Sequence, residues 1–180
     1  MKKITTLLLF LSIHLIFSQN SKIEYENFKL QANKELVWQK VYDIKGSKDS
    51  INKHLKDFIT TNSFLNKLKY DNYGYTGFSN YTKISDLNGV TISAHTDFNC
   101  FISIEIKENE YRISISNVKF KPLPKDFNKT GNNTDVILED ITVRNKFHEI
   151  RNKIRELRNR KSARKTLLQL NLHFIKILTL

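Results

Sequence analysis

The sequence predicts an α+β domain built on antiparallel strand pairing, with a basic helical region at its C-terminal end. Three observations predict this class. Residues 99–107 and 111–120 alternate between apolar and polar types on either side of a short polar turn. Residues 48–61, and again 143–157, instead place apolar side chains at three- and four-residue steps, which is the period of a helix. Strand pairs and amphipathic helices in separate stretches are typical of α+β domains.

The first 20 residues have the pattern of an export signal. Lys2 and Lys3 precede an apolar run over residues 4–17, and small Ser18 stands at the expected cleavage position. The run is shorter than the ~20 residues that a membrane-spanning helix needs. We expect residues 1–18 to be a signal peptide and the processed chain, which begins at Gln19, to be periplasmic or secreted without a transmembrane span. A buried or membrane-anchoring helix is the alternative.

Residues 19–34 are polar and are expected to form a leader or an edge strand, and residues 35–137 to form the antiparallel-sheet domain. Residues 35–45 are rich in β-branched and aromatic types and predict a strand. Ser47 or Asp49 then provides an N-cap for a helix over residues 48–61, which ends near Asn62. The apolar face of this helix consists of Ile51, Leu55, Phe58 and Ile59.

The centre of the chain predicts further strands. Turn signals at 71–74 and 86–89 separate a strand at 75–84 from a short strand at 90–95. The clearest element follows, a hairpin over residues 99–120 that turns at 108–110. Its alternation predicts one buried face, which includes Ile102, Ile104, Ile113 and Ile115. Both prolines lie in residues 121–137, which we interpret as a loop.

Two features of this region have a structural and a functional interpretation. Cys100 is the single cysteine, so no intramolecular disulfide can form, and a buried inert thiol is favoured over a nucleophile. An aromatic series could form a stacking platform for sugars or bases, although strand-face packing explains it equally well. The series consists of Tyr70, Tyr73, Tyr75, Phe78 and Tyr81.

Residues 138–180 are expected to form basic and apolar helices that pack on the domain. Val143, Phe147, Ile150, Ile154 and Leu157 form the predicted helical stripe. The sequence from 144 to 165 has ten basic residues and two acids, Glu149 and Glu156, a net +8. The whole chain is +12, and loss of Lys2 and Lys3 leaves +10. Residues 167–180 are apolar but too short to span a bilayer, so they pack on the core or lie in a membrane interface.

The ten basic residues are the candidate site, either as a solvated helix face or as a surface for polyanions. The expected partners are anionic lipid, lipopolysaccharide, acidic polysaccharide or an acidic protein. Export argues against nucleic acid as a partner. The predicted anionic-surface residues are Arg144, Lys146, Arg151, Lys153, Arg155, Arg158, Arg160, Lys161, Arg164 and Lys165.

The layout resembles a family of secreted bacterial proteins, a domain of unknown function described as having a TATA-box-binding-protein-like fold. The resemblance covers residues 35–120. It implies a curved antiparallel sheet with helices packed on one face and a late helix with an apolar ending. It implies no catalytic residues, and a fold name alone does not bring DNA binding with it. The residues that carry the resemblance are Trp38 to Tyr42, the helix after Gly46-Ser47-Lys48, Phe101 to Lys107 and Glu110 to Asn117.

No catalytic motif emerges from the sequence. It has no Gly-rich phosphate loop, no His-Glu-x-x-His and no cysteine pair, so we assign no catalytic, cofactor-binding or metal-binding residue and expect no cofactor. The favoured function is an exported, non-enzymatic module, an envelope binding or adaptor protein. The alternative is a small periplasmic enzyme with its site in a sheet cleft. That alternative requires polar side chains such as His95, Asp97, Tyr111 and Arg112 to converge in one pocket.

Overall fold

The computed structural model describes residues 23–123, 134–151 and 160–179. The predicted signal peptide therefore lies outside the described residues. The strands are β1 (Glu24–Tyr25), β2 (Phe28–Leu30), β3 (Leu36–Asp43), β4 (Lys69–Asp71), β5 (Gly74–Phe78), β6 (Phe98–Lys107), β7 (Glu110–Phe120), β8 (Val136–Ile137), β9 (Val143–Arg144) and β10 (Glu149–Ile150). The helices are α2 (Lys48–Thr61), the 3-10 turn η1 (Ile92–Ala94), α3 (Leu138–Thr142) and α4 (Arg160–Leu178).

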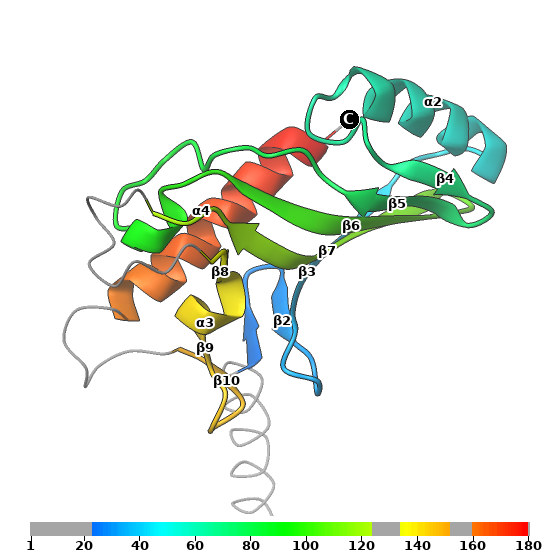
Figure 1. Ribbon diagram of the computed structural model, residues 1–180. Helices are drawn as coiled ribbons and strands as arrows, with labels where there is room; N and C mark the ends of the chain where they lie inside the picture. Colours follow the sequence, from blue (N-terminus) through cyan, green and yellow to red (C-terminus); the bar gives the residue numbers. More distant parts are fainter. Residues whose placement is uncertain (1–22, 124–133, 152–159, 180) are drawn as a thin grey trace, which may run out of the picture.

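Eight of the described strands form one open antiparallel sheet (Figure 1). Their order is β1-β2-β3-β7-β6-β5-β4, and β8 pairs with the end of β7. The long hairpin β6–β7 lies at the centre, with Ile102 opposite Ile115 and Ile104 opposite Ile113. All four isoleucines are at most 1 % exposed. The hairpin, its turn and its buried face are therefore confirmed, because a period of two places alternate residues on one side of the sheet.

Helix α2 has the predicted bounds. The Ser47 side chain accepts a hydrogen bond from the Ser50 backbone N–H, so it caps the first turn as expected. Ile51, Leu55 and Ile59 are buried. The hydroxyl of Tyr75, which lies opposite Ile104 in the sheet, donates to Asn52 of α2. Helix α2 therefore covers the apolar face of the sheet near β5.

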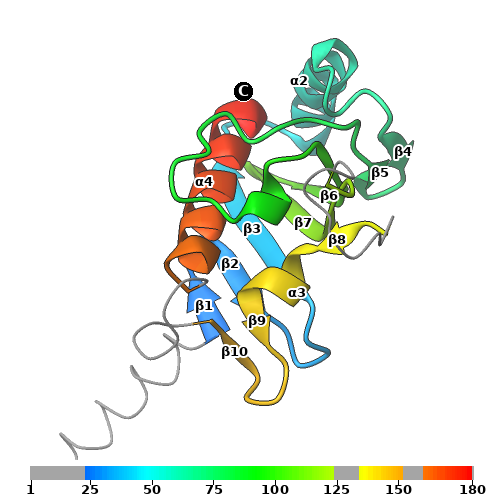
Figure 2. The same ribbon diagram turned by 60° about the vertical axis from the view of Figure 1, so that its left-hand side comes forward.

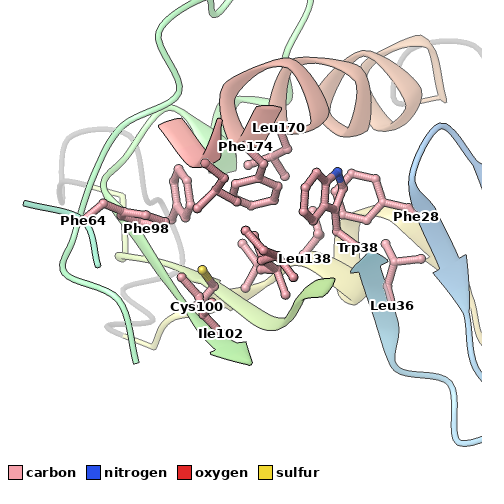
Figure 3. Close-up of a cluster of buried hydrophobic side chains, with 14 of the residues drawn as sticks. Phe28, Leu36, Trp38, Phe64, Phe98, Cys100, Ile102, Leu138, Leu170 and Phe174 are labelled. Atoms are coloured by element: carbon pink, nitrogen blue, oxygen red, sulfur yellow. The ribbon is translucent and has the colours of Figure 1, made fainter. Parts of the chain in front are cut away.

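Helix α4 crosses the same apolar face (Figures 1 and 2). Its buried apolar side chains recur at helical steps and are Ala163, Leu167, Leu170, Phe174 and Leu178. The Phe174 ring contacts Trp38 and Phe98 at centroid distances of 5.5 and 6.0 Å, and Figure 3 shows these rings together. The Oδ1 atom of Asn171 accepts from the Trp38 indole N–H at 2.9 Å. The predicted class, an α+β domain with helices on one face of a curved antiparallel sheet, is confirmed.

The interpretation of residues 143–151 as a helix is wrong. These residues form a small separate hairpin, in which Ile150 of β10 pairs with Val143 of β9. Both side chains are buried, whereas Phe147 at the turn is 57 % exposed. A spacing of seven residues places two side chains on one face of a helix, but it equally matches a cross-strand pair around a short turn. The rest of the predicted stripe, Ile154 and Leu157, lies outside the described residues.

Two smaller predictions also differ from the structure. The strand predicted at 75–84 ends at Phe78, and beyond it Thr82 makes only an isolated bridge to Phe98. Residues 90–95 contain the 3-10 turn η1 rather than a strand. Its Ala94 is fully buried, and Thr91 bonds through its backbone N–H to Thr166 of α4. Packing against α4 therefore determines the local conformation there.

Candidate anionic-surface site

The β9–β10 hairpin carries the strongest candidate site. Val143 and Ile150 anchor it to the core, and the Arg151 backbone N–H donates to the Thr142 carbonyl at 2.7 Å. The turn closes through a hydrogen bond from the Phe147 N–H to the Arg144 carbonyl at 3.0 Å. His148 has a left-handed backbone with φ of 46°, which completes the reversal. A buried base and a hydrogen-bonded turn hold the exposed tip in one arrangement.

Cations gather around the exposed Phe147 ring at this tip. The Arg144 guanidinium lies 4.7 Å and the Lys146 ammonium 5.9 Å from the ring centroid, both within cation–π range. Beside the ring is a depression of about 460 Å³, whose lining includes Arg144, Lys146 and Arg151 and one carboxylate, Asp140. This lining suits an anion in contact with an apolar ring.

The three cations of the hairpin are not equivalent. Arg151 is structural, because its Nε donates to the Val143 carbonyl and its Nη2 to the Asp140 carbonyl, both at 3.2 Å. Arg144 forms an ion pair with Glu149 at 3.3 Å. Lys146 is exposed and forms no ion pair with any residue that the structure describes. Lys146 is therefore the charge most available to a partner.

The other predicted basic residues are spread along the chain. Arg164 stacks over the Tyr25 ring at 4.9 Å, and Lys165 is exposed on α4. Arg160 and Lys161 have only their backbone described, in the first turn of α4. Lys153, Arg155 and Arg158 lie outside the described residues. The start of α4 and the β9–β10 hairpin lie at the same end of the molecule in both ribbon views, away from α2 (Figures 1 and 2).

The side chains required by the enzyme alternative do not converge. His95 and Asp97 line a depression of about 400 Å³ with Lys83 and Lys121. Tyr111 lies on the buried face of the sheet, stacked on Tyr42 at 5.0 Å, and burial raises its pKa to about 12. Arg112 alternates with Tyr111 and therefore lies on the opposite face. The four residues thus occupy three separate places.

The depression at Asp97 offers little reactivity. The Asp97 carboxylate accepts a hydrogen bond from the Lys121 ammonium at 2.7 Å and lies 3.7 Å from Lys83. The hydrogen bond to Lys121 holds the pKa of Asp97 below its usual value and raises the pKa of Lys121. Both groups are therefore stabilised in their charged forms, which disfavours proton transfer by either of them. His95 Nε2 lies 3.3 Å from the Val90 carbonyl oxygen.

A third depression, of about 650 Å³, was not anticipated from the sequence. It lies beside Phe78 and Phe101, an edge-to-face pair with centroids 5.4 Å apart, and its wall includes Glu139. Glu139 Oε1 accepts from the Leu36 backbone N–H at 2.9 Å, whereas Oε2 is buried with no partner among the described residues. Burial raises the pKa of Glu139. Leu36 and Glu139 are 103 residues apart in the sequence, so no local sequence signal could have indicated this hydrogen bond.

The predicted aromatic series does not form one platform. Tyr75 is buried, whereas Tyr70 packs edge-to-face on it and Tyr73 stands 77 % exposed at the β4–β5 turn. Phe78 belongs to the third depression, and the Tyr81 ring lies under Lys121 at 4.3 Å. The rings therefore belong to separate environments.

Cys100 is fully buried, as expected. Burial raises the pKa of its thiol to about 12, although a contact with the Ser79 hydroxyl opposes this. Because the thiolate is the reactive form, a nucleophilic role is disfavoured. Within the described residues, no group of three or more His, Cys, Asp or Glu side chains lies close enough together to hold a metal ion. The described helices also include none with the length and hydropathy of a membrane span.

Comparison with known proteins defines the fold. The chain resembles a solved TBP-like protein from Parabacteroides distasonis with a TM-score of 0.53 and 15 % identity, over 82 % of this chain and 93 % of that one. It also resembles a DUF4468 family protein from Bacteroides ovatus with a TM-score of 0.53 and 11 % identity, over 89 % and 91 % of the two chains. No family model and no curated protein matches the sequence.

The chain therefore has the TBP-like fold of bacterial proteins of unknown function, and the resemblance inferred from its sequence is confirmed at the level of fold. At these identities the likeness carries no functional residue from either protein to this one.

Proposed function

We propose that this chain is an exported, non-enzymatic binding module that attaches to an anionic surface of the cell envelope. The β9–β10 hairpin and the basic start of α4 form the contact. The observation that carries the proposal is the cluster of Arg144 and Lys146 around the exposed Phe147 ring, on a hairpin held in place by Arg151. Near an anionic membrane each Lys or Arg contributes about 1 kcal/mol, so a few such contacts suffice for reversible attachment.

Export rests on the sequence pattern of residues 1–18. The intact mass of the protein recovered outside the cytoplasm tests it. We expect a chain that begins at Gln19 or within a few residues of it. A mass that retains residues 1–18 would contradict export by cleavage.

Vesicle co-sedimentation of the processed chain tests binding. The processed form is required because the apolar run of residues 4–17 would itself enter a bilayer. We expect binding to phosphatidylglycerol vesicles at low salt, and little to phosphatidylcholine vesicles or at high salt, because exposed charges are screened. Equal binding to both lipids, or indifference to salt, would contradict the proposal.

A matched pair of variants assigns the contact. Lys146→Glu reverses an exposed charge on the hairpin, and Lys56→Glu reverses an exposed charge on α2 at the other end of the molecule (Figure 1). Both change the net charge equally. We expect Lys146→Glu to weaken binding at least about ten-fold and Lys56→Glu to have a small effect. Equal weakening would indicate that net charge alone, rather than this surface, drives attachment.

A further inference from the structure

We infer that Phe147 is a membrane anchor, whose ring enters the boundary between headgroups and acyl chains of an anionic phospholipid layer. Arg144 and Lys146 would then lie at the level of the lipid phosphates. The inference rests on the proposed function and adds to it, because electrostatic attachment alone requires no insertion.

The position of the ring supports insertion. Phe147 is 57 % exposed at the turn of a hairpin that extends from the body of the molecule (Figures 1 and 2). The buried pair Val143 and Ile150 and the Arg151 hydrogen bonds fix the base of this hairpin. Because these contacts already restrain the backbone of the tip, little conformational entropy is lost when the ring enters another phase.

The surroundings of the ring identify the partner. A sugar ring of an acidic polysaccharide would have to stack on a face of the Phe147 ring, over which Arg144 and Lys146 already lie. A phospholipid layer presents phosphates at its surface and an apolar region directly beneath them. The basic groups match the phosphates and the exposed ring matches the apolar region beneath them. Amphipathic helices that lie in a membrane interface combine basic and aromatic side chains in the same way. Charge and apolar complementarity together therefore favour lipid.

The β4–β5 turn provides a matched comparison within the same chain. Tyr73 is also an exposed aromatic residue at a hairpin turn, at 77 % exposure. A carboxylate, Asp71, lies at this turn, and its Oδ1 atom accepts hydrogen bonds from the Tyr73 and Gly74 backbone N–H groups. The Lys48 ammonium donates to the Asn72 carbonyl of this turn at 3.4 Å, but among the described residues no cation lies over the Tyr73 ring as Arg144 and Lys146 lie over Phe147. The structure therefore predicts that Tyr73 stays in water when the protein is on a membrane.

Tryptophan fluorescence tests the inference. The natural Trp38 is fully buried and gives the same background in every variant. Phe147→Trp and Tyr73→Trp each place a second indole at one of the two exposed turns. The processed variants are mixed with phosphatidylglycerol vesicles, with or without bromine on the acyl chains. We expect the Phe147→Trp emission to move to shorter wavelength and to be quenched at least two-fold more by brominated vesicles. Tyr73→Trp should show neither change.

The outcomes separate this inference from the proposed function. If Phe147→Trp sediments with vesicles but is not quenched, insertion is wrong while electrostatic attachment stands. If it does not sediment while the natural chain does, the ring is needed for binding but cannot be replaced by a larger one. Phe147→Leu then decides, because it keeps an apolar side chain that can insert. Binding retained in Phe147→Leu and lost in Phe147→Ser supports insertion, and equal binding of these two overturns it. If the natural chain itself does not sediment, the proposed function fails.

Discussion

Two β-hairpins of the described structure, β6–β7 and β9–β10, differ in what they bury. The β6–β7 hairpin lies at the centre of the sheet, and its inward isoleucines are at most 5 % exposed. The β9–β10 hairpin buries one pair, Val143 and Ile150, and exposes the aromatic residue at its turn. The β6–β7 hairpin therefore stabilises the core, whereas the β9–β10 hairpin exposes side chains that a partner can contact. Changes in the first should affect stability, and changes in the second should affect binding.

The largest effect is expected in the long hairpin. Ile104→Asp would place a charge at a position that is 1 % exposed, next to Tyr75 and Ile113. An unpaired buried charge should lower the free energy of unfolding by about 4 kcal/mol or more. Urea denaturation measures this. Val41→Asp, on the exposed face of β3 at 43 % exposure, is the control and should cost no more than about 1 kcal/mol. Equal effects would show that the assigned register is wrong.

A smaller loss of stability is expected from Gly74→Ala. Gly74 lies in β5, the strand that pairs with β6 of the long hairpin. A Cβ at Gly74 would lie 1.8 Å from the Ile104 carbonyl oxygen, so β5 would have to move away from β6. We expect a cost of about 2–3 kcal/mol. Gly46 is a matched control, since its φ of +152° is close to the +157° of Gly74 but its nearest neighbour would be 3.6 Å away. Thermal unfolding of Gly74→Ala and Gly46→Ala separates the effect of the steric clash, which only Gly74→Ala has, from the effect of the backbone conformation, which both variants share.

The contact between α4 and the long hairpin should be sensitive to pH. His173 packs 5.7 Å from the Phe98 ring, and neither ring nitrogen has a hydrogen-bond partner among the described residues. Burial, and then the nearby Lys176, lower the pKa of His173 in the folded state below 6.5. The unfolded chain therefore binds the proton first, so stability should fall as pH drops below about 6.5.

His173→Leu should remove this part of the pH dependence in urea denaturation at several pH values between 7.5 and 5. Glu139 acts in the opposite direction, because burial raises its pKa above 4.5 and its protonation favours the folded state. The difference between the natural chain and His173→Leu, rather than either profile alone, isolates the histidine. A difference that does not change with pH would contradict a buried neutral imidazole.

The smallest effect on stability is expected at the short hairpin. Phe147→Ser removes an exposed ring whose contacts are with Arg144 and Lys146, so the free energy of unfolding should change by less than about 0.5 kcal/mol. Binding to anionic vesicles should nevertheless weaken. Urea denaturation and co-sedimentation of the same variant check both parts. A loss above 2 kcal/mol would mean that the ring supports the fold rather than a contact.

The sequence predicted those elements whose signals are local. Alternation over residues 99–120 and the Ser47 cap before α2 each determine structure within a few residues, so both were correct. The β9–β10 hairpin was missed because seven-residue spacing between Val143 and Ile150 satisfies a helix and a hairpin alike. The Phe147 exposure that distinguishes them depends on the tertiary structure. The basic residues of the candidate site were predictable from the sequence. The stacking of Arg144 on Phe147 was not, because it depends on the turn between β9 and β10.

Hydrogen–deuterium exchange of the processed chain tests the central claim most directly, because it reports on both hairpins at once. Exchange is measured with phosphatidylglycerol vesicles, with phosphatidylcholine vesicles and without vesicles. We predict that peptides covering residues 143–151 become protected only with the anionic vesicles and only at low salt. Peptides covering 98–120 should exchange equally slowly in all three conditions. Unchanged exchange at 143–151 with bound anionic vesicles, or equal protection by neutral vesicles, would contradict the assignment of the short hairpin as the anionic-surface contact.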